Sequence, residues 1–424
     1  MALDDNGIRD VTMARKTKPS GSGNGAPKSG RDKRLSLMRE IETLRHGRLF
    51  IAYVTSTRPG FEIQIADDVL PFIHKHLNAG AAKAAKGVDL FIHSNGGHGT
   101  TPWRIVNLIR EYTKDFAVLV PHHAFSAATL IALGANKIIM HKMGCLGPID
   151  PSVANPFNPA HPQNPGQLIP ISVEDVSAYF TLIKDDIGVQ HEDELIQAVI
   201  ALTDKIHPLA LGNVQRSHQQ SRLIARKLLR KHMPEVEREH EIDQLIENLK
   251  SNLYFHGHPI NRVEARADLN LKVEDASTAL ERSMWALYEE YSQELKIKDR
   301  FNPVHEWDIH QPEPAQVAAA PSTQEIVAQI QQLAQAGVGL GSGLSEEQLV
   351  DLAAALLPHV SGTRKSAASK VRLTNIKGAY VEAIDSSDVF VTDLTIERAT
   401  VNTPAGPQDA VKQEVLWQRW QVEN

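Results

Sequence analysis

Two short motifs, each following an apolar run, carry residue types that could perform acyl transfer. Ser94-Asn95-Gly96-Gly97 follows the run 88–92, and Phe125-Ser126-Ala127-Ala128 follows the run 116–120. Apolar runs of this length are typical of buried strands, and a helical pattern follows each motif. Glycine lets backbone N–H groups approach a ligand, and a serine at a helix N-terminus lies where the helix dipole favours negative charge. The motifs therefore predict a nucleophilic serine beside an anion hole.

Each motif also has an ordinary structural interpretation. A serine at the start of a helix often acts only as an N-cap, and a glycine pair after a strand often forms only a turn. Neither motif is specific by itself. Their succession within one predicted β-α-β-α segment favours the catalytic interpretation.

The stretch from about Leu49 to Val273 resembles the serine dehydrogenase proteinase family, relatives of signal peptide peptidase A within the Clp-protease/crotonase superfamily. Five blocks carry the resemblance, at 94–97, 121–135, 143–151, 210–218 and 255–265. The most specific feature is the serine block followed by Leu-Gly-Pro-Ile-Asp-Pro at 146–151.

The resemblance implies an α/β fold, a ClpP/crotonase-like spiral of ββα units with parallel strands. It also implies that Ser126 is the nucleophile and that Gly96 and Gly97 form one side of the oxyanion hole. Ala127, directly after the serine, would supply the other N–H group. Members of this superfamily commonly assemble into homo-oligomers, so we expect one here.

Lys184 is the predicted general base. Ser172 and Gly188 are plausible ends of a helix in which Val173, Val176, Phe180, Lys184 and Ile187 fall on one face. A lysine in an apolar stripe would be buried, and burial lowers the pKa of an ammonium as a general base requires. In Ser–Lys members of the superfamily, the base comes from such a helix.

A Ser-His-Asp arrangement is the alternative. Clp-type peptidases carry their histidine in a region that here reads 146–151 and contains none. His141 comes too early by that comparison, and His122 and His123 are too close in sequence to face Ser126 easily. His141 and Asp150 are retained as possible supporting residues, although an aspartate before proline is also ordinary turn chemistry.

Three classes of function follow from these motifs. The first is an ATP-independent serine endopeptidase with a Ser–Lys dyad that hydrolyses polypeptides. The second is a catalytically silent oligomeric scaffold on the same fold, and the third is a crotonase-like acyl-thioester enzyme that uses the glycine hole without a nucleophile. The peptidase needs no cofactor and no metal. His256 and His258, without nearby Cys, Asp or Glu partners, are weak evidence for a metal pair.

Composition is typical of an intracellular enzyme. The chain has 424 residues, 42% of them apolar, which is enough for a large core and more than one domain. Cys145 is the single cysteine, which excludes an internal disulfide and fits a reducing, cytoplasmic compartment. A net charge of −6 argues against a nucleic-acid binder. No run of about 18 apolar residues predicts a transmembrane segment, and we expect no membrane association through the basic N-terminal tail.

Changes in composition predict five segments. Residues 1–36 read as a flexible basic tail, and residues 37–300 as the ClpP/crotonase-like peptidase domain with its helical extension. A Pro/Ala-rich linker follows at 301–322, then a short helical pair with a Gly-rich hinge at 323–365. Alternating apolar residues predict a small β-rich C-terminal module at 366–424.

Overall fold

A computed structural model describes residues 30–149, 152–153, 155–161, 164–233, 238–249, 258–310, 370–403 and 406–423, with isolated positions between 324 and 351. Residues 1–29 of the predicted tail, most of the helical pair at 323–365, Asp150 and His256 lie outside the described residues.

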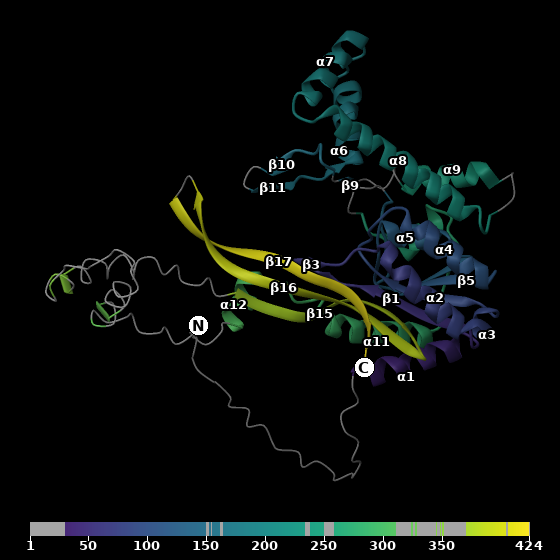
Figure 1. Ribbon diagram of the computed structural model, residues 1–424. Helices are drawn as coiled ribbons and strands as arrows, with labels where there is room; N and C mark the ends of the chain where they lie inside the picture. The colour runs from purple at the N-terminus through teal and green to yellow at the C-terminus, as the bar shows by residue number, and fades with distance from the viewer. Residues whose placement is uncertain are drawn as a thin grey trace, which may run out of the picture.

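The described elements alternate between strands and helices over the first half of the chain (Figure 1). The strands are β1 Leu49–Thr55, β2 Thr57–Arg58, β3 Phe61–Glu62, β4 Val88–His93, β5 Phe116–Val120, β6 His123–Ala124, β7 Lys137–Met140, β8 Cys145–Leu146, β9 Ser152–Val153, β10 Ala160–His161, β11 Asn164–Leu168, β12 Ile171–Ser172, β13 Ile260–Asn261, β14 Val273–Glu274, β15 Lys370–Ala383, β16 Ser386–Thr403 and β17 Gly406–Val422. The helices are α1 Gly30–Leu44, α2 Leu70–Ala79, α3 Ala81–Ala84, α4 Thr101–Tyr112, α5 Ala127–Leu133, α6 Val173–Thr181, α7 Glu192–Thr203, α8 Pro208–Leu229, α9 Glu239–Glu247, α10 Arg262–Ala267, α11 Thr278–Glu294 and α12 Pro303–Ile309, with short helical turns η1 Asp67–Val69 and η2 Leu182–Asp186.

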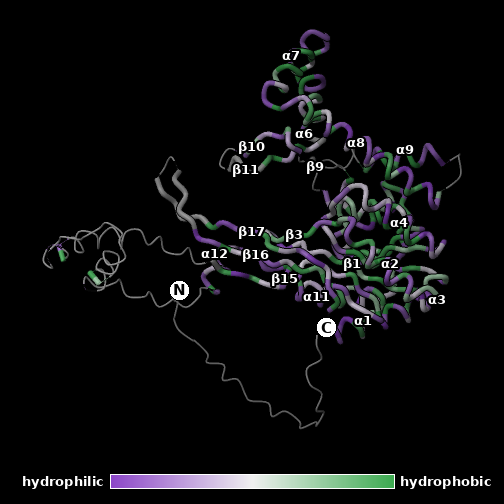
Figure 2. Tube along the Cα trace, viewed as in Figure 1, coloured by the Kyte–Doolittle hydropathy of each residue, from purple (hydrophilic) through white to green (hydrophobic). Residues whose placement is uncertain are grey.

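A mostly parallel sheet organises the body of the molecule. Its order is β14-β7-β5-β4-β1-β15-β16-β17, and the first five strands run parallel. Every residue of β1, β4 and β5 is buried. Strands covered on both faces read as continuous apolar runs, which is why the runs at 88–92 and 116–120 predict them correctly. One face packs under α2, α4, α5 and α8, and the other under α1 and α11. Figure 2 shows the apolar residues gathered in this body.

The C-terminal strands extend this sheet and do not form a separate module. β15 pairs antiparallel with β1, with Ala52 opposite Glu382 and Thr55 opposite Ala379. Tyr380 packs into the core on one face of the sheet and Val381 into the core on the other. The alternating pattern predicts the strands but cannot identify their partner, which is strand β1 of the main sheet.

The N-terminal boundary also differs from the prediction. Helix α1 begins at Gly30, so the last residues of the predicted tail are helical. Arg34, predicted to be solvated, is fully buried, and its Nε donates to Glu382 Oε2 at 2.8 Å. Tyr291 donates to the same carboxylate at 2.7 Å. A basic residue in a tail-like sequence is buried here because an acidic partner on β15 pairs with it.

The first part of the predicted linker contains a helix. Residues 303–309 form α12, and the side chains of Phe301 and Trp307 are buried in a small core beneath β15 and β16. The part of the linker that follows residue 310 lies outside the described residues.

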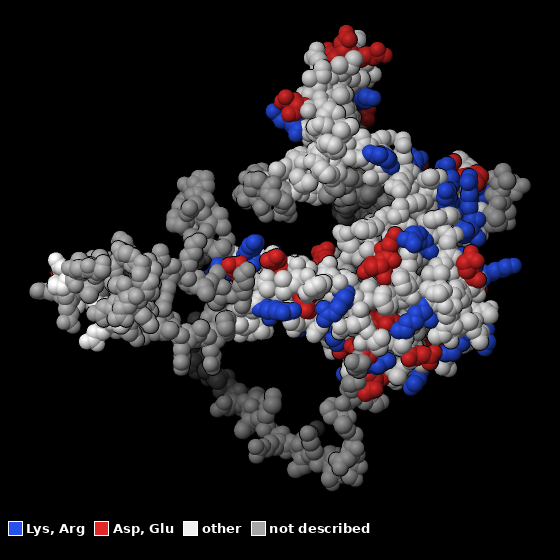
Figure 3. Space-filling view, viewed as in Figure 1, with Lys and Arg blue, Asp and Glu red and all other residues white. Residues whose placement is uncertain are grey.

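An arm made of α6, η2, α7 and the first turns of α8 projects from the body (Figure 1). Several of its apolar side chains are exposed: Leu182, Ile187, Ile196, Val199, Ile200 and Leu209. Much of the arm's visible surface carries neither acidic nor basic side chains (Figure 3). Within the described part of the chain, no helix is both long enough and apolar enough to span a bilayer.

Candidate active site

Ser126 lies at the corner between β6 and α5, as the sequence predicts. Its backbone has φ 49° and ψ −112°, a conformation that a residue with a Cβ rarely adopts. Its side chain is partly exposed, whereas every residue of α5 behind it is buried. Such strained residues cluster at functional sites, because the surrounding structure holds them in place.

Gly96 packs directly against this corner. It has φ 108°, and a Cβ placed on it would lie 2.7 Å from the Ser126 Cβ and 2.9 Å from the Phe125 carbonyl oxygen. Both the backbone conformation and the lack of space require glycine at this position. The two sequence motifs are therefore in contact in the folded chain.

Two N–H groups at this contact are free among the described residues. Ile65 N donates to Gly96 O and His98 N donates to Ile65 O, each at 2.8 Å, while the N–H of Gly97 between them bonds to no described residue. The N–H of Ala127 likewise has no described partner, and a Cβ on Gly96 would lie 3.2 Å from that nitrogen. Two free donors beside a serine hydroxyl can stabilise an oxyanion.

The third predicted donor has another role. The Gly96 N–H donates to Ser94 Oγ at 3.0 Å, so it is already used within the loop. The structure brings the three predicted members, Gly96, Gly97 and Ala127, together, but only the N–H groups of Gly97 and Ala127 have no partner in the described part of the chain. Gly96 contributes by allowing close approach.

Ser94 joins the glycine loop to the serine corner. The Ser94 N–H donates to His123 O, and the Phe125 N–H donates to Ser94 O, both at 3.0 Å. Ser94 is fully buried, and its Oγ also accepts a hydrogen bond from Thr55 Oγ1 at 2.8 Å. Sequence reasoning missed Thr55, whose only signal is a hydroxyl at the end of an apolar strand.

Thr129 fixes the other side of the corner. Its buried Oγ1 lies 2.7 Å from the Ala124 carbonyl oxygen and 2.9 Å from the Gly147 carbonyl oxygen. It also accepts the Gly147 N–H at 3.1 Å. This residue ties α5 to β6 and to the Leu-Gly-Pro segment. The sequence analysis missed it because a threonine inside an apolar helix resembles ordinary core.

Three neighbouring histidines, His93, His122 and His123, lie at and beside β6, the strand that precedes Ser126. His93 is fully buried, and its Nδ1 accepts the His123 N–H at 3.2 Å. The rings of His122 and His123 stack at 3.9 Å, and His123 also stacks on Phe125. Burial lowers the pKa of all three side chains, and with the neighbouring His122 it lowers the pKa of His123 to about 4. These rings are uncharged at neutral pH.

No general base is bonded to the nucleophile in the described part of the chain. The Ser126 hydroxyl makes no hydrogen bond with any described residue. His141 stacks on Trp285 at 5.0 Å, and its Nδ1 accepts the Met143 N–H.

The predicted burial of Lys184 is wrong for this chain. Lys184 lies in η2 on the arm and is exposed, and Ile187 on the same predicted stripe is 64% exposed. The apolar face was assumed to meet the core, but α6 contacts β12 and α8 at the base of the arm and η2 contacts α6 and α7. In a single copy of the chain, the Lys184 side chain is therefore exposed to solvent.

His258, one of the two histidines of the predicted weak metal pair, has a structural role, whereas His256 lies outside the described residues. His258 Nε2 lies 3.1 Å from the Glu264 carboxylate, which also caps α10 together with Asn261. Among the residues that the structure describes, no group of three or more His, Cys, Asp or Glu side chains could hold a metal ion.

Comparison with known proteins identifies relatives of parts of this chain. The chain is 42% identical over 73 residues to the uncharacterized protein MJ0137 of Methanocaldococcus jannaschii, covering 17% of this chain and 26% of that protein. It is 39% identical over 66 residues to the uncharacterized protein MJ1495 of the same organism, covering 16% and 23%. The matches therefore span about a quarter of these relatives. The family of ClpP-like SDH-type serine proteinases matches residues 61–315, more than half of the chain, and this protein belongs to that family.

Proposed function

We propose that this protein is a serine endopeptidase with Ser126 as its nucleophile. The observation that carries the proposal is the strained Ser126 in contact with Gly96, beside the free N–H groups of Gly97 and Ala127. The Ser126 Oγ attacks the peptide carbonyl carbon, forming a C–O bond, and its proton passes to the base. The tetrahedral intermediate then releases the amine, which takes that proton, and water hydrolyses the acyl-enzyme.

The oxyanion hole supplies much of the proposed rate enhancement. The carbonyl oxygen gains negative charge in the tetrahedral intermediate, where the Gly97 and Ala127 N–H groups would donate to it. Loss of one such donor typically costs about 100- to 1000-fold in rate. The N-terminus of α5 adds a favourable field, although this helix is short. No step of this mechanism consumes ATP. We also propose that the parallel strands and helices follow the ββα spiral of the ClpP/crotonase superfamily.

We propose Lys184 as the base, with assembly of several copies as the condition for its action. In a single copy of the chain Lys184 is exposed and lies on the arm, whereas a lysine that acts as a general base is normally removed from water. Contact between the arm and another copy would cover the exposed side chains of Ile187, Ile196 and Ile200 and remove the neighbouring Lys184 amine from water.

Two alternatives belong with this proposal. A histidine could serve as the base, since burial keeps the rings near Phe125 neutral. A catalytically silent oligomeric scaffold is favoured by one observation, the lack of a described hydrogen-bond partner for the Ser126 hydroxyl.

Covalent labelling with a fluorophosphonate probe, followed by mass spectrometry, distinguishes these possibilities. The proteins are the wild type, Ser126→Ala, Lys184→Ala and the control Lys205→Ala, whose side chain is 79% exposed on the same arm. We expect labelling at Ser126 in the wild type and in Lys205→Ala only.

Each other result has a definite meaning. Full labelling of Lys184→Ala would reject Lys184 as the general base and favour a histidine in that role. A folded, oligomeric wild type that does not label would support the scaffold. Light scattering on the same samples reports the oligomeric state.

A further inference from the structure

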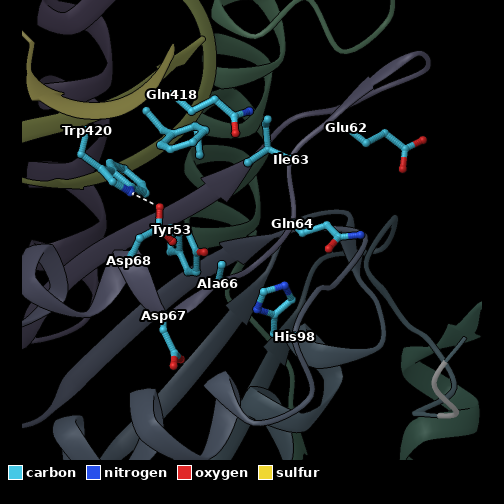
Figure 4. A pocket seen from close by; sticks show the side chains of 12 residues that line it. Tyr53, Glu62, Ile63, Gln64, Ala66, Asp67, Asp68, His98, Gln418 and Trp420 are labelled. Carbon is cyan, nitrogen blue, oxygen red and sulfur yellow. Dashed lines mark hydrogen bonds between the residues drawn. The ribbon is translucent and has the colours of Figure 1, made fainter. Parts of the chain in front are cut away.

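A surface cavity of about 430 Å³ lies between the C-terminal strands and the segment that follows β3. Figure 4 shows Trp420, from β17, and Asp68 on one side of this space and Gln64 and His98 on the other, while the Glu62 and Asp67 carboxylates lie at its margins. β15, β16 and β17 lie outside the part of the chain that matches the peptidase family. This wall of the cavity is therefore an addition of this chain to the matched region.

The lining combines aromatic rings with carboxylates. Tyr53, Phe390 and Trp420 provide the rings, and Glu62, Asp67 and Asp68 provide the carboxylates. The described residues that line the cavity include no Lys or Arg. A cation is attracted both by carboxylates and by the faces of aromatic rings. The lining chemistry therefore favours a positively charged group with an apolar stem.

Hydrogen bonds hold parts of this lining in place. Trp420 Nε1 donates to Asp68 Oδ2 at 2.8 Å, and the Trp420 ring packs 4.9 Å from Phe72 and 5.4 Å from Phe390. Asp67 accepts from Thr101 Oγ1 and pairs with Arg104, which offsets part of its charge. Glu62 has a single long contact, 3.5 Å from Asn95 Nδ2, and is exposed. Glu62 and Asp68 thus provide most of the uncompensated negative charge.

The cavity adjoins the proposed oxyanion hole through one isolated β-bridge. Ile65 pairs with Gly97, and Gln64, Ala66 and His98 on either side of this pairing line the cavity. His98 directly follows Gly97, whose N–H is a proposed oxyanion donor, and consecutive Cα atoms are about 3.8 Å apart. A polypeptide held at Ser126 would therefore place a neighbouring residue beside the cavity.

We propose that this cavity is a specificity subsite for a lysine or arginine side chain of the polypeptide substrate, a few residues from the scissile bond. The aliphatic stem of that side chain packs along Trp420 and Phe390, and its charged end lies among Glu62, Asp67 and Asp68. The inference rests on the proposed peptidase function, and it adds a substrate preference that the family assignment does not supply.

Quenched fluorogenic peptides test this preference. In each peptide pair, one position near the scissile bond carries either lysine or acetyl-lysine, which has nearly the same shape without the charge. We expect wild-type kcat/KM to favour lysine by about tenfold at one such position, from two partly exposed carboxylates and a cation–π contact. Glu62→Gln with Asp68→Asn should reduce this ratio to about twofold or less, mainly through KM. The control Glu111→Gln, an exposed carboxylate on α4 away from the cavity, should keep the wild-type ratio.

A binding measurement separates this inference from the proposed function. Ser126→Ala protein is titrated with the same lysine and acetyl-lysine peptides, carrying a fluorescein label, and binding is followed by anisotropy. Tighter binding of the lysine peptide, lost in the Glu62→Gln and Asp68→Asn background, supports the subsite even if no peptide is hydrolysed. Equal affinity for both peptides, or a preference that survives both substitutions, overturns it. Failure of the wild type to cleave any peptide or to label with fluorophosphonate would refute only the peptidase proposal.

Discussion

Substitution of Gly96 by alanine is the sharpest test of the active-site geometry. The added methyl group would lie 2.7 Å from the Ser126 Cβ, 2.9 Å from the Phe125 carbonyl oxygen and 3.2 Å from the Ala127 nitrogen. All three atoms belong to backbone or to the first side-chain carbon, so rotation of a side chain cannot relieve the contacts. The φ of 108° adds strain for any residue other than glycine.

The magnitude follows from these contacts. Holding a non-glycine residue at such a φ costs about 1–3 kcal/mol of stability. The serine corner must move away from the glycine loop by several tenths of an ångström or more. A displacement near 1 Å can cost about 100-fold in rate, similar to the loss of one oxyanion donor. We therefore expect the rate of fluorophosphonate labelling to fall at least about 100-fold, while the protein stays folded.

Gly99→Ala is the matched control. A Cβ on Gly99 would meet no atom within 4 Å, and Gly99 lies three residues along the same loop. Labelling rates and urea unfolding curves are measured for the wild type and both variants. Gly99→Ala should label like the wild type. If Gly96→Ala also labels at the wild-type rate, the assigned contact between the glycine loop and the nucleophile is incorrect.

Three further outcomes are expected. Arg34→Ala should lower the free energy of unfolding by about 3–5 kcal/mol, because it leaves the buried Glu382 carboxylate without its cation. Urea unfolding measures this loss, and a value below about 1 kcal/mol would contradict the ion pair. The free energy of unfolding should fall as pH drops from about 6.5 towards 4, because burial lowers the pKa of His123 to about 4 and the unfolded chain binds more protons in this range. The contribution of His123 is at most about 3 kcal/mol, and less where water screens the ring. His123→Phe should therefore flatten the curve of Tm against pH relative to the wild type. Ser94→Ala removes the hydrogen bonds that Ser94 Oγ makes with the Gly96 N–H and with Thr55. Fluorophosphonate labelling should then slow by about tenfold or more, and the free energy of unfolding should fall by about 1–3 kcal/mol. A wild-type labelling rate would show that Ser94 does not position the glycine loop.

The sequence alone determined the framework of this protein. Continuous apolar runs specify strands that are covered on both faces, and the motifs that follow them lie at strand-to-helix corners because parallel strands end at one edge of the sheet. Gly96 and Ser126 were identifiable as a pair because their motifs follow two successive apolar runs and resemble the motifs of one family. The family assignment follows from the same motifs.

Only the tertiary structure decided which groups meet. Whether a Gly96 or a Gly97 N–H is free depends on Ser94 and Ile65, which a local pattern cannot place. The helical spacing of apolar residues does not identify the element that packs against them, so the exposure of Lys184 on the arm could not be predicted from that spacing. The burial of Arg34 required a carboxylate from β15, hundreds of residues away in the chain. Local propensities and periodicity are short-range properties, whereas ion pairing, strand partners and cavities come from contacts between distant segments.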